Sequence, residues 1–422
     1  MKALTRVKIL IVAAGSHGDV LPFIALGAEL RRRGHEPHLF AIAVFEPLAR
    51  QAGLPFTALG SAEFYDGLLR HPDLNHPSRS LRVMAQAMEH TGATAWATLD
   101  AAVVPGQTLV VGSTLAFATR SLAERHGLPA VTVHLAPAVL RTLHTLPRHG
   151  GPVPGARAPR WLKRLFWRLV DDFLVAPTLG AVLNRHRRAV GLAPVHRPMG
   201  DWLNQADLVI GLFPDWYAPR QPDWPAGLVL TGFPLYDSAP GMDLPPELES
   251  FLAAGPPPVA FTSGTATARA LDFFTASAEA CRLSGRRGVL LTRHADQVPG
   301  PLPPDVVRVD YAPFSRLLPR CAAFVHHGGI GTISQALAAG VPQLIRPMAH
   351  DQFDNAARTV ALGVGRQLPM RRYRPAAVAA ALEHLTDDHA MKRRCAEVAA
   401  RLVADTAITE ACDRILALVP RR

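Results

Sequence analysis

Apolar runs that end in glycine-bearing turns alternate with stretches of helical periodicity along most of the chain. The first run, Val7–Ala14, is followed by the turn Gly15–Asp19, and this pattern predicts a buried parallel strand. Residues 20–30 then repeat apolar side chains at helical spacing and end in three arginines and a glycine, which predicts a helix and its stop. A second strand over His38–Val44 completes a predicted β-α-β unit, and such units imply a parallel sheet.

The same alternation continues in two groups separated by a proline-dense stretch at 232–258. It predicts strands at Thr108–Gly112, Ala130–Leu135 and Leu208–Leu212, then at Val259–Thr262, Gly288–Thr292, Val306–Val309, Ala322–His326 and Pro342–Ile345. We therefore expect an α/β protein with two doubly wound, Rossmann-like domains, because strands alternate with helices in both groups. The expected parts are a first domain at 1–235, a proline-rich linker at 236–257, a second domain at 258–405 and a helix at 406–422 that packs back on the first domain. Ligands of such folds bind at the carboxyl ends of the strands, so the site is expected in a cleft between the domains.

The amino-acid composition indicates the class of protein but does not identify its binding partner. Hydrophobic residues make up 49% and charged residues 19% of the 422 residues, which indicates a globular chain. The net charge of +11 favours anionic partners, whether nucleotides, nucleic acid, acidic substrates or a membrane surface. The four cysteines form no CxxC pair and no zinc-ligand spacing, and no apolar run reaches the ~18 residues of a membrane span. We expect a cytoplasmic protein.

A strand that runs into three glycines carries the most chemical information. The segment Ala322–Leu337 reads AAFVHHGGIGTISQAL; glycines let a ligand approach the backbone, and the N–H groups of a helix start attract anions. It lacks the GK[ST] of a phosphate-binding P-loop and the third glycine of a dinucleotide fingerprint. An ordinary strand–turn–helix junction is the alternative. His326 can offer an imidazolium or an N–H to a phosphate, and Asp351 with Gln352 can grip sugar hydroxyls, although Asp351 could instead cap a helix.

The ordered set Tyr311-Ala312-Pro313, His326–Thr332, Ala339–Pro342 and His350–Asn355 resembles the nucleotide-sugar signature of family 1 glycosyltransferases, which adopt the two-domain GT-B fold. The resemblance implies a role for each matching position. His326 contacts the donor diphosphate with the backbone of Gly328, Gly329, Gly331 and Thr332 and with Thr265; Tyr311 stacks on the base and the Ala312 backbone pairs with its edge; His350, Asp351 and Gln352 hold the sugar. No metal and no further cofactor is implied.

The turn after the first predicted strand, Gly15–Pro22, resembles the G-[ST]-x-G-D-V-x-P form of bacterial antibiotic and lipid glycosyltransferases. The resemblance implies Asp19 as the base that takes the proton of the acceptor hydroxyl, with His17 as a supporting group. The alternative from the residues alone is that Asp19 caps the following helix. Asp is a weak base at its reference pKa of ~3.9, but an apolar surrounding raises that value.

A closer resemblance joins this turn, His350–Asn355 and the stretch Leu212–Asp237 to the rhamnosyltransferases of rhamnolipid synthesis. It implies L-rhamnose from dTDP-rhamnose as donor and an acidic lipid, a 3-hydroxyalkanoyl-oxyalkanoate, as acceptor. Alternatives are a UDP-sugar-dependent transferase acting on a sterol, polyketide or other hydrophobic aglycone, a sugar-nucleotide epimerase of the same fold, and a nucleotide-sugar-binding or membrane-docking protein without catalysis.

Residues 157–188 carry a cluster of arginines interleaved with tryptophan, phenylalanine and leucine. Basic and apolar residues at helical spacing are typical of a helix that lies on an anionic membrane, which would make the protein peripheral at the inner membrane face. They are equally typical of a core helix with one solvated face. Nucleic acid is not expected as a partner, because no recognised nucleic-acid module accompanies the cluster.

Overall fold

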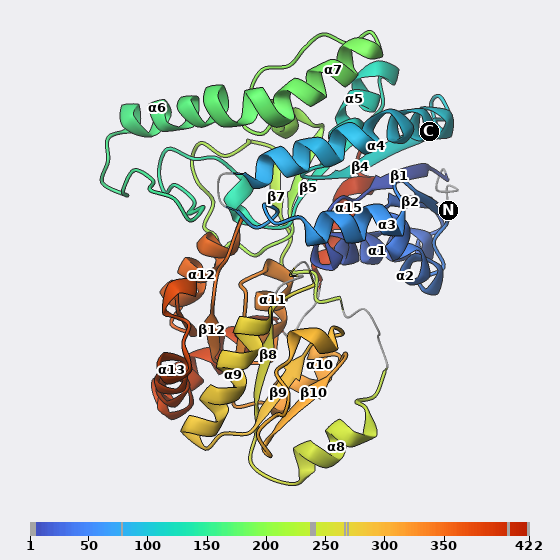
Figure 1. Ribbon diagram of the computed structural model, residues 1–422. Coiled ribbons are helices and arrows are strands. Elements are labelled where there is room, and N and C mark those ends of the chain that lie inside the picture. The colour runs from blue at the N-terminus through green and yellow to red at the C-terminus, as the bar shows by residue number, and fades with distance from the viewer. Residues whose placement is uncertain are drawn as a thin grey trace. The chain divides into compact units, whose positions relative to one another are not determined.

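Two compact units make up the computed structural model, which describes residues 6–76, 79–236, 242–265, 267, 270–402 and 406–419. Unit 1 contains residues 1–234 together with 406–422, and unit 2 contains residues 235–405. Each unit has one parallel sheet with helices around it (Figure 1). The predicted α/β fold with two Rossmann-like domains is thereby confirmed.

Unit 1 has a seven-stranded parallel sheet in the order β3-β2-β1-β4-β5-β6-β7. Its strands are β1 (Lys8–Val12), β2 (Glu36–Ala41), β3 (Phe56–Ala58), β4 (Thr108–Ser113), β5 (Ala130–His134), β6 (Leu208–Gly211) and β7 (Leu228–Leu230). The central strands β4, β5 and β6 are buried along their whole length, as expected for strands covered on both faces. The chain order reverses between β1 and β4, so this pair marks the switch point of the sheet.

Helices pack around the sheet of unit 1, and one of them, the last helix of the chain, joins this unit after the residues of unit 2. They are α1 (His17–Arg32), α2 (Glu46–Gln51), α3 (Ala62–Arg70), α4 (Ser80–Ala102), α5 (Phe117–His126), α6 (Arg160–Val170), the π-helical segment η3 (Asp171–Gly180), α7 (Ala181–Ala189) and α15 (Ala407–Leu416). Helix α15 packs against α1, where the Cys412 thiol donates to the Leu26 carbonyl and Arg33 pairs with Asp413.

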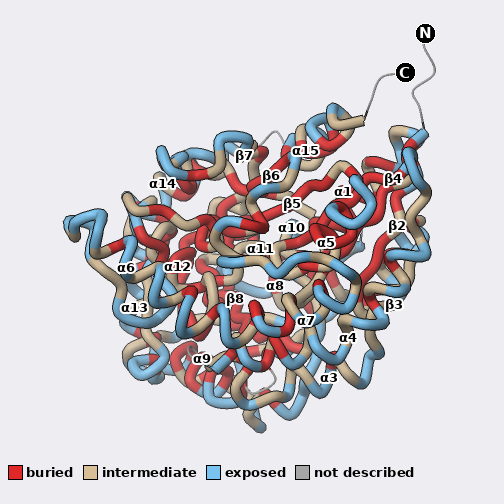
Figure 2. Tube along the Cα trace, turned by 90° about the horizontal axis from the view of Figure 1, so that it is seen from above, coloured by how far each residue is buried: buried red, intermediate tan, exposed pale blue. Residues whose placement is uncertain are grey.

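Unit 2 has a six-stranded parallel sheet in the order β10-β9-β8-β11-β12-β13, with its switch point between β8 and β11. The strands are β8 (Val259–Thr262), β9 (Gly288–Leu291), β10 (Val306–Val309), β11 (Ala323–His326), β12 (Gln343–Ile345) and β13 (Gly365–Gln367). The helices are α8 (Pro246–Ala253), α9 (Leu271–Ser284), α10 (Phe314–Leu317), α11 (Ile330–Ala338), α12 (Gln352–Ala361), α13 (Pro375–Asp387) and α14 (His389–Ala399). Figure 2 shows buried residues gathered along the strands and exposed residues on the outer helices and turns.

Part of the predicted linker belongs to unit 2. Residues 246–253 form α8, and Leu248 and Leu252 join Leu244 in the core beside the sheet. The prolines do not prevent this helix, because Pro246 occupies its first turn, where a missing N–H costs nothing. Residues 237–241 of the predicted linker lie outside the described part of the chain.

Candidate active site

Asp19 lies in the first turn of α1, directly after β1 and therefore at the carboxyl edge of the unit 1 sheet. The helix cap is Ser16, not Asp19. The Ser16 backbone N–H and hydroxyl donate to Asp19 Oδ2 at 2.7 and 2.9 Å, which closes a capping box. No hydrogen bond to Oδ1 is found within the described residues. Oδ2 is therefore fixed by Ser16, whereas Oδ1 can accept a proton or a hydrogen bond from a substrate.

Gly15 makes this arrangement of the carboxylate feasible. Its φ of +131° lies in the region that favours glycine, and a Cβ there would stand 2.4 Å from Asp19 Oδ2. Burial raises the pKa of Asp19 above 3.8, while the two hydrogen bonds from Ser16 act in the opposite direction. A partly buried carboxylate with a raised pKa is a stronger proton acceptor than an exposed one.

An aromatic row lies beside this carboxylate. The His17 ring contacts Phe45 edge-on with centroids 5.0 Å apart, and Phe45 contacts Tyr65 in the same way at 5.8 Å. The Tyr65 hydroxyl is buried without a hydrogen-bond partner in the described structure, and burial together with the Asp19 charge raises its pKa. His17 thus lies two residues before Asp19 and begins this row. Tyr65 is a residue of this candidate site that no pattern in the sequence indicates.

The second predicted corner, His326–Thr332, follows β11 at the switch point of the unit 2 sheet. His326 itself is fully buried as the last residue of the strand. Its Nδ1 accepts from the Gly328 backbone N–H at 3.1 Å, and its Nε2 lies 3.1 Å from Gln343 Oε1. Burial lowers the pKa of His326 to about 3, so the ring is neutral. With both ring nitrogens bonded inside unit 2, His326 shapes the glycine turn and does not present its ring to a ligand.

His327 is the imidazole that stands in the corner. Its ring is wedged between two glycines: a Cβ at Gly264 would come within 2.5 Å of the ring, and so would a Cβ at Gly329. Burial lowers its pKa to about 4, and its Nδ1 has no hydrogen-bond partner within the described residues. A neutral imidazole offers one N–H donor and no charge. The sequence prediction chose the adjacent residue, His326. The sequence pattern alone does not show which of the two histidine rings is buried at the end of the strand.

Helix α11 begins behind this ring and completes the corner at which the sequence predicts anion binding. Gly329 is its N-cap, and Gly331 and Thr332 lie partly exposed in its first turn. The unpaired N–H groups of a helix start attract negative charge. Gly264, with φ +85°, follows β8, the neighbour of β11, and Thr265 is exposed in the same turn. The predicted phosphate residues therefore gather at one sheet edge.

The predicted sugar-binding residues are joined to this corner by hydrogen bonds. His350 adopts φ +56°, an uncommon conformation that turns the chain sharply before α12. The Asn355 amide donates to the Gly328 carbonyl at 3.1 Å and to Asp351 Oδ2 at 2.7 Å. Gln352 Oε1 accepts from the backbone N–H groups of Met348 and Ala349, and no hydrogen bond of its amide nitrogen is found among the described residues.

The predicted base-binding residues follow the edge strand β10. Ala312 is buried in the core of unit 2, and the Tyr311 ring lies partly exposed with the Arg293 guanidinium 5.6 Å from its centre. Arg293 follows β9 at the same edge and was not predicted. A cation on one face of Tyr311 leaves less of the ring for stacking on a base.

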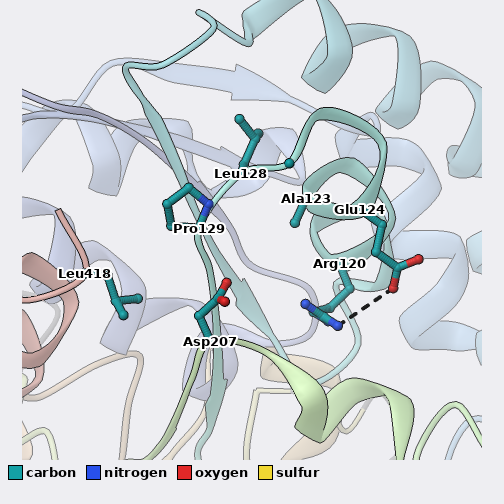
Figure 3. Close-up of a pocket in the computed structure, with 8 residues that line it drawn as sticks. Arg120, Ala123, Glu124, Leu128, Pro129, Asp207 and Leu418 are labelled. Atoms are coloured by element: carbon teal, nitrogen blue, oxygen red, sulfur yellow. Dashed lines mark ion pairs between the residues drawn. The ribbon is translucent and has the colours of Figure 1, made fainter. Parts of the chain in front are cut away.

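Unit 1 also contains a cavity of about 490 Å³ that lies away from Asp19 (Figure 3). It is lined by Arg120, Glu124, Leu128, Pro129, Asp207 and Leu418, among others. Pro129 and Asp207 directly precede β5 and β6, so the cavity sits at the amino ends of the strands, away from the edge that carries Asp19. It is not part of the candidate site. Across the described residues, no group of three His, Cys, Asp or Glu side chains is arranged to hold a metal ion.

Comparison with known proteins gives the class. Residues 9–145 match the glycosyltransferase family 28 N-terminal domain, and residues 288–418 match the erythromycin biosynthesis protein CIII-like C-terminal domain. The chain is 32% identical to O-mycaminosyltylonolide 6-deoxyallosyltransferase of Streptomyces fradiae, with 96% of each chain covered. It is 30% identical to vancomycin aglycone glucosyltransferase of Amycolatopsis orientalis, over 96% of this chain and 98% of that one. The protein therefore belongs to the family 1-type glycosyltransferases that combine these two domains.

Solved structures agree on the fold. The glycosyltransferase of kitacinnamycin superposes with a TM-score of 0.74 over 98% of this chain and all of that one, at 23% identity. The glycosyltransferase VinC, solved in complex with dTDP, gives a TM-score of 0.69 over 98% and 99% of the two chains, at 22% identity. The predicted GT-B fold is confirmed. The finer resemblance to rhamnolipid enzymes is not supported by these relatives, which are named for a macrolide and a glycopeptide acceptor.

Proposed function

We propose that this protein transfers a sugar from a nucleoside diphosphate donor, preferably a dTDP-deoxyhexose, to a hydroxyl of a hydrophobic natural-product aglycone. The observation that carries the proposal is the donor corner of unit 2, where His327, the start of α11 and the Gln352 amide share one sheet edge. The relatives support the aglycone class, since one acts on O-mycaminosyltylonolide and another on the vancomycin aglycone by name. The dTDP bound to VinC supports thymine as the nucleobase of the donor.

The donor would bind with its diphosphate over the first turn of α11. Backbone N–H groups there and the His327 N–H supply neutral donors for a charge that grows as the sugar leaves, and such fixed donors are usually the largest catalytic contribution. Asp351 and Gln352 would hold the sugar hydroxyls, which fixes the anomeric carbon in place. Tyr311 and Ala312 would flank the base.

Asp19 would act as the general base of an inverting transfer. Its carboxylate accepts the proton of the acceptor hydroxyl while that oxygen forms a bond to the anomeric carbon. The bond from the anomeric carbon to the diphosphate breaks on the opposite face, and the nucleoside diphosphate departs with the electron pair.

A donor and acceptor panel tests the proposal. Purified protein is incubated with dTDP-rhamnose, dTDP-glucose or UDP-glucose and with either O-mycaminosyltylonolide or a 3-hydroxyalkanoyl-oxyalkanoate. A parallel incubation contains the donor alone. Products are separated by chromatography beside sugar-nucleotide standards and identified by mass spectrometry. We expect glycosylated macrolide, formed best from a dTDP donor. Glycosylated lipid alone would restore the rhamnolipid hypothesis, and a new sugar nucleotide formed without acceptor would identify an epimerase instead.

A further inference from the structure

Four large apolar side chains form a stripe on the outer face of α6 and η3. Trp161, Leu165, Leu169 and Phe173 are 64%, 43%, 46% and 76% exposed. Their spacing of four residues keeps them on one side of the helical rod that α6, η3 and α7 build in unit 1 (Figure 1). Single exposed apolar residues are ordinary, but a contiguous row of this size marks an interaction surface.

The inner face of the same rod is fixed by polar contacts. The buried Lys163 ammonium donates to the carbonyls of His144 and Ala156 at 2.6 and 2.8 Å. The Trp167 indole N–H donates to the Thr142 carbonyl at 3.1 Å, and Asp171 pairs with Arg141 at 2.6 Å. Turning the apolar stripe inward would break all of these contacts, so its exposure is a property of the folded unit. Further along the rod, Leu179, Val182 and Leu183 belong to a core cluster, so the apolar core contacts of the rod lie beyond the stripe.

A row of arginines runs along one side of the stripe. Arg157, Arg160, Arg164 and Arg168 are exposed, and the last three each precede a stripe residue. Asp172 is the one exposed carboxylate between 157 and 173, and it lies 3.6 Å from Arg168. Within the described residues, no carboxylate lies within ion-pair distance of the other three arginines. The surface thus combines an apolar stripe with an uncompensated basic flank.

We propose that this surface, residues 157–173, docks the protein on a membrane that carries anionic lipids. Apolar side chains beside a basic row are what a helix needs to lie at a lipid interface, because the stripe enters the acyl boundary while the guanidiniums meet the headgroups. A second copy fits less well: in an antiparallel two-fold pair, both arginine rows would lie along the same side of the contact and repel. Docking is peripheral, since no described helix is long and apolar enough to cross a bilayer.

Vesicle binding tests the docking without any substrate, so its outcome is independent of the proposed function. The full chain is sedimented with sucrose-loaded vesicles of phosphatidylcholine, alone or mixed equally with phosphatidylglycerol. We expect binding to the mixed vesicles only, and less binding as salt rises, because salt screens the arginines. Failure to bind mixed vesicles, or equal binding to both kinds, overturns the proposal.

Paired variants locate the contact. Leu169→Ser/Phe173→Ser should lower the partition coefficient by about tenfold or more, and Arg160→Gln/Arg164→Gln should lower it most at low salt. The control variants change exposed apolar and basic residues of unit 2: Leu271→Ser/Leu283→Ser and Arg371→Gln/Arg372→Gln should bind like the wild type. Thermal unfolding by circular dichroism verifies that each variant is folded.

Two results would overturn the assignment. One is undiminished vesicle binding by the folded Leu169/Phe173 variant. The other is a wild-type dimer in sedimentation velocity that this variant converts to a monomer, which would assign the stripe to a second copy of the chain.

Discussion

At the scale of single residues, the candidate site depends on small differences between neighbours. His326 and His327 are adjacent, yet one is sealed in the end of β11 with both ring nitrogens bonded, and the other stands between two glycines at the anion corner. Side chains of a strand alternate in direction, so one of two adjacent histidines turns inward. The sequence predicts an imidazole at this corner, but its pattern cannot show which of the two rings faces it.

Replacing each histidine in turn separates their roles. His327→Ala should weaken dTDP binding at least severalfold with little change in the unfolding midpoint, because it removes an N–H at the corner and no internal bond. His326→Ala should instead cost about 2–4 kcal/mol of stability, because it leaves a cavity and an unbonded Gly328 N–H. Calorimetry with dTDP and thermal unfolding measure the two effects. The reverse pattern would return the phosphate role to His326.

The pH dependence of the rate reports on Asp19. Only the carboxylate accepts a proton, so kcat/KM should fall as pH falls through the pKa of Asp19, which burial raises above 3.8. The acidic limb should therefore appear above that reference value. The profile is measured over the range in which circular dichroism shows a folded protein. A rate that stays flat down to the acid end of that range contradicts the assignment.

At the scale of elements, the sequence predicted ten of the thirteen strands in the described residues, most of them rich in Val, Leu, Ile and Phe. The three it missed, β3, β7 and β13, are three-residue strands at sheet edges, where few side chains are buried and the pattern is short. Helix α8 was hidden by its prolines, although Leu248 and Leu252 stand four apart. Long-range packing, not local pattern, decides such elements.

The turn after β8 offers an element-scale test with an internal control. Gly264 and Gly285 both have φ near the left-handed region, at +85° and +62°, so alanine at either should cost about 1–2 kcal/mol of backbone strain. Only at Gly264 would the new methyl press on the His327 ring, since the space around Gly285 is open. Calorimetry should therefore show weaker dTDP binding for Gly264→Ala alone. Equal affinities of the two variants would remove the Gly264–His327 contact from the donor site.

At the scale of the whole molecule, buried histidines set the response to acid. Burial lowers the pKa of His134 and His327 to about 4 and that of His326 to about 3, against 6.5 in an unfolded chain. Between these values the unfolded chain binds more protons than the folded one, so the free energy of unfolding rises with pH across this window.

Stability should accordingly be fully present above pH ~6.5 and decline as the pH falls toward 4. Urea unfolding at a series of pH values measures this, and His134→Gln should flatten the slope for unit 1, where His134 bonds Thr114 and Asn204. An unfolding free energy that is constant from pH 7 to 4.5 would show that these rings bind protons as readily in the folded state as in the unfolded chain.

The central claim is that an Asp19 carboxylate drives sugar transfer from a donor held by unit 2. Its most direct test measures macrolide glycosylation and dTDP-sugar binding side by side for the wild type and Asp19→Asn. We expect turnover to fall by at least about 10²-fold, the lower range for general-base catalysis, while calorimetric donor affinity is unchanged. Near wild-type turnover by the folded variant would contradict the account.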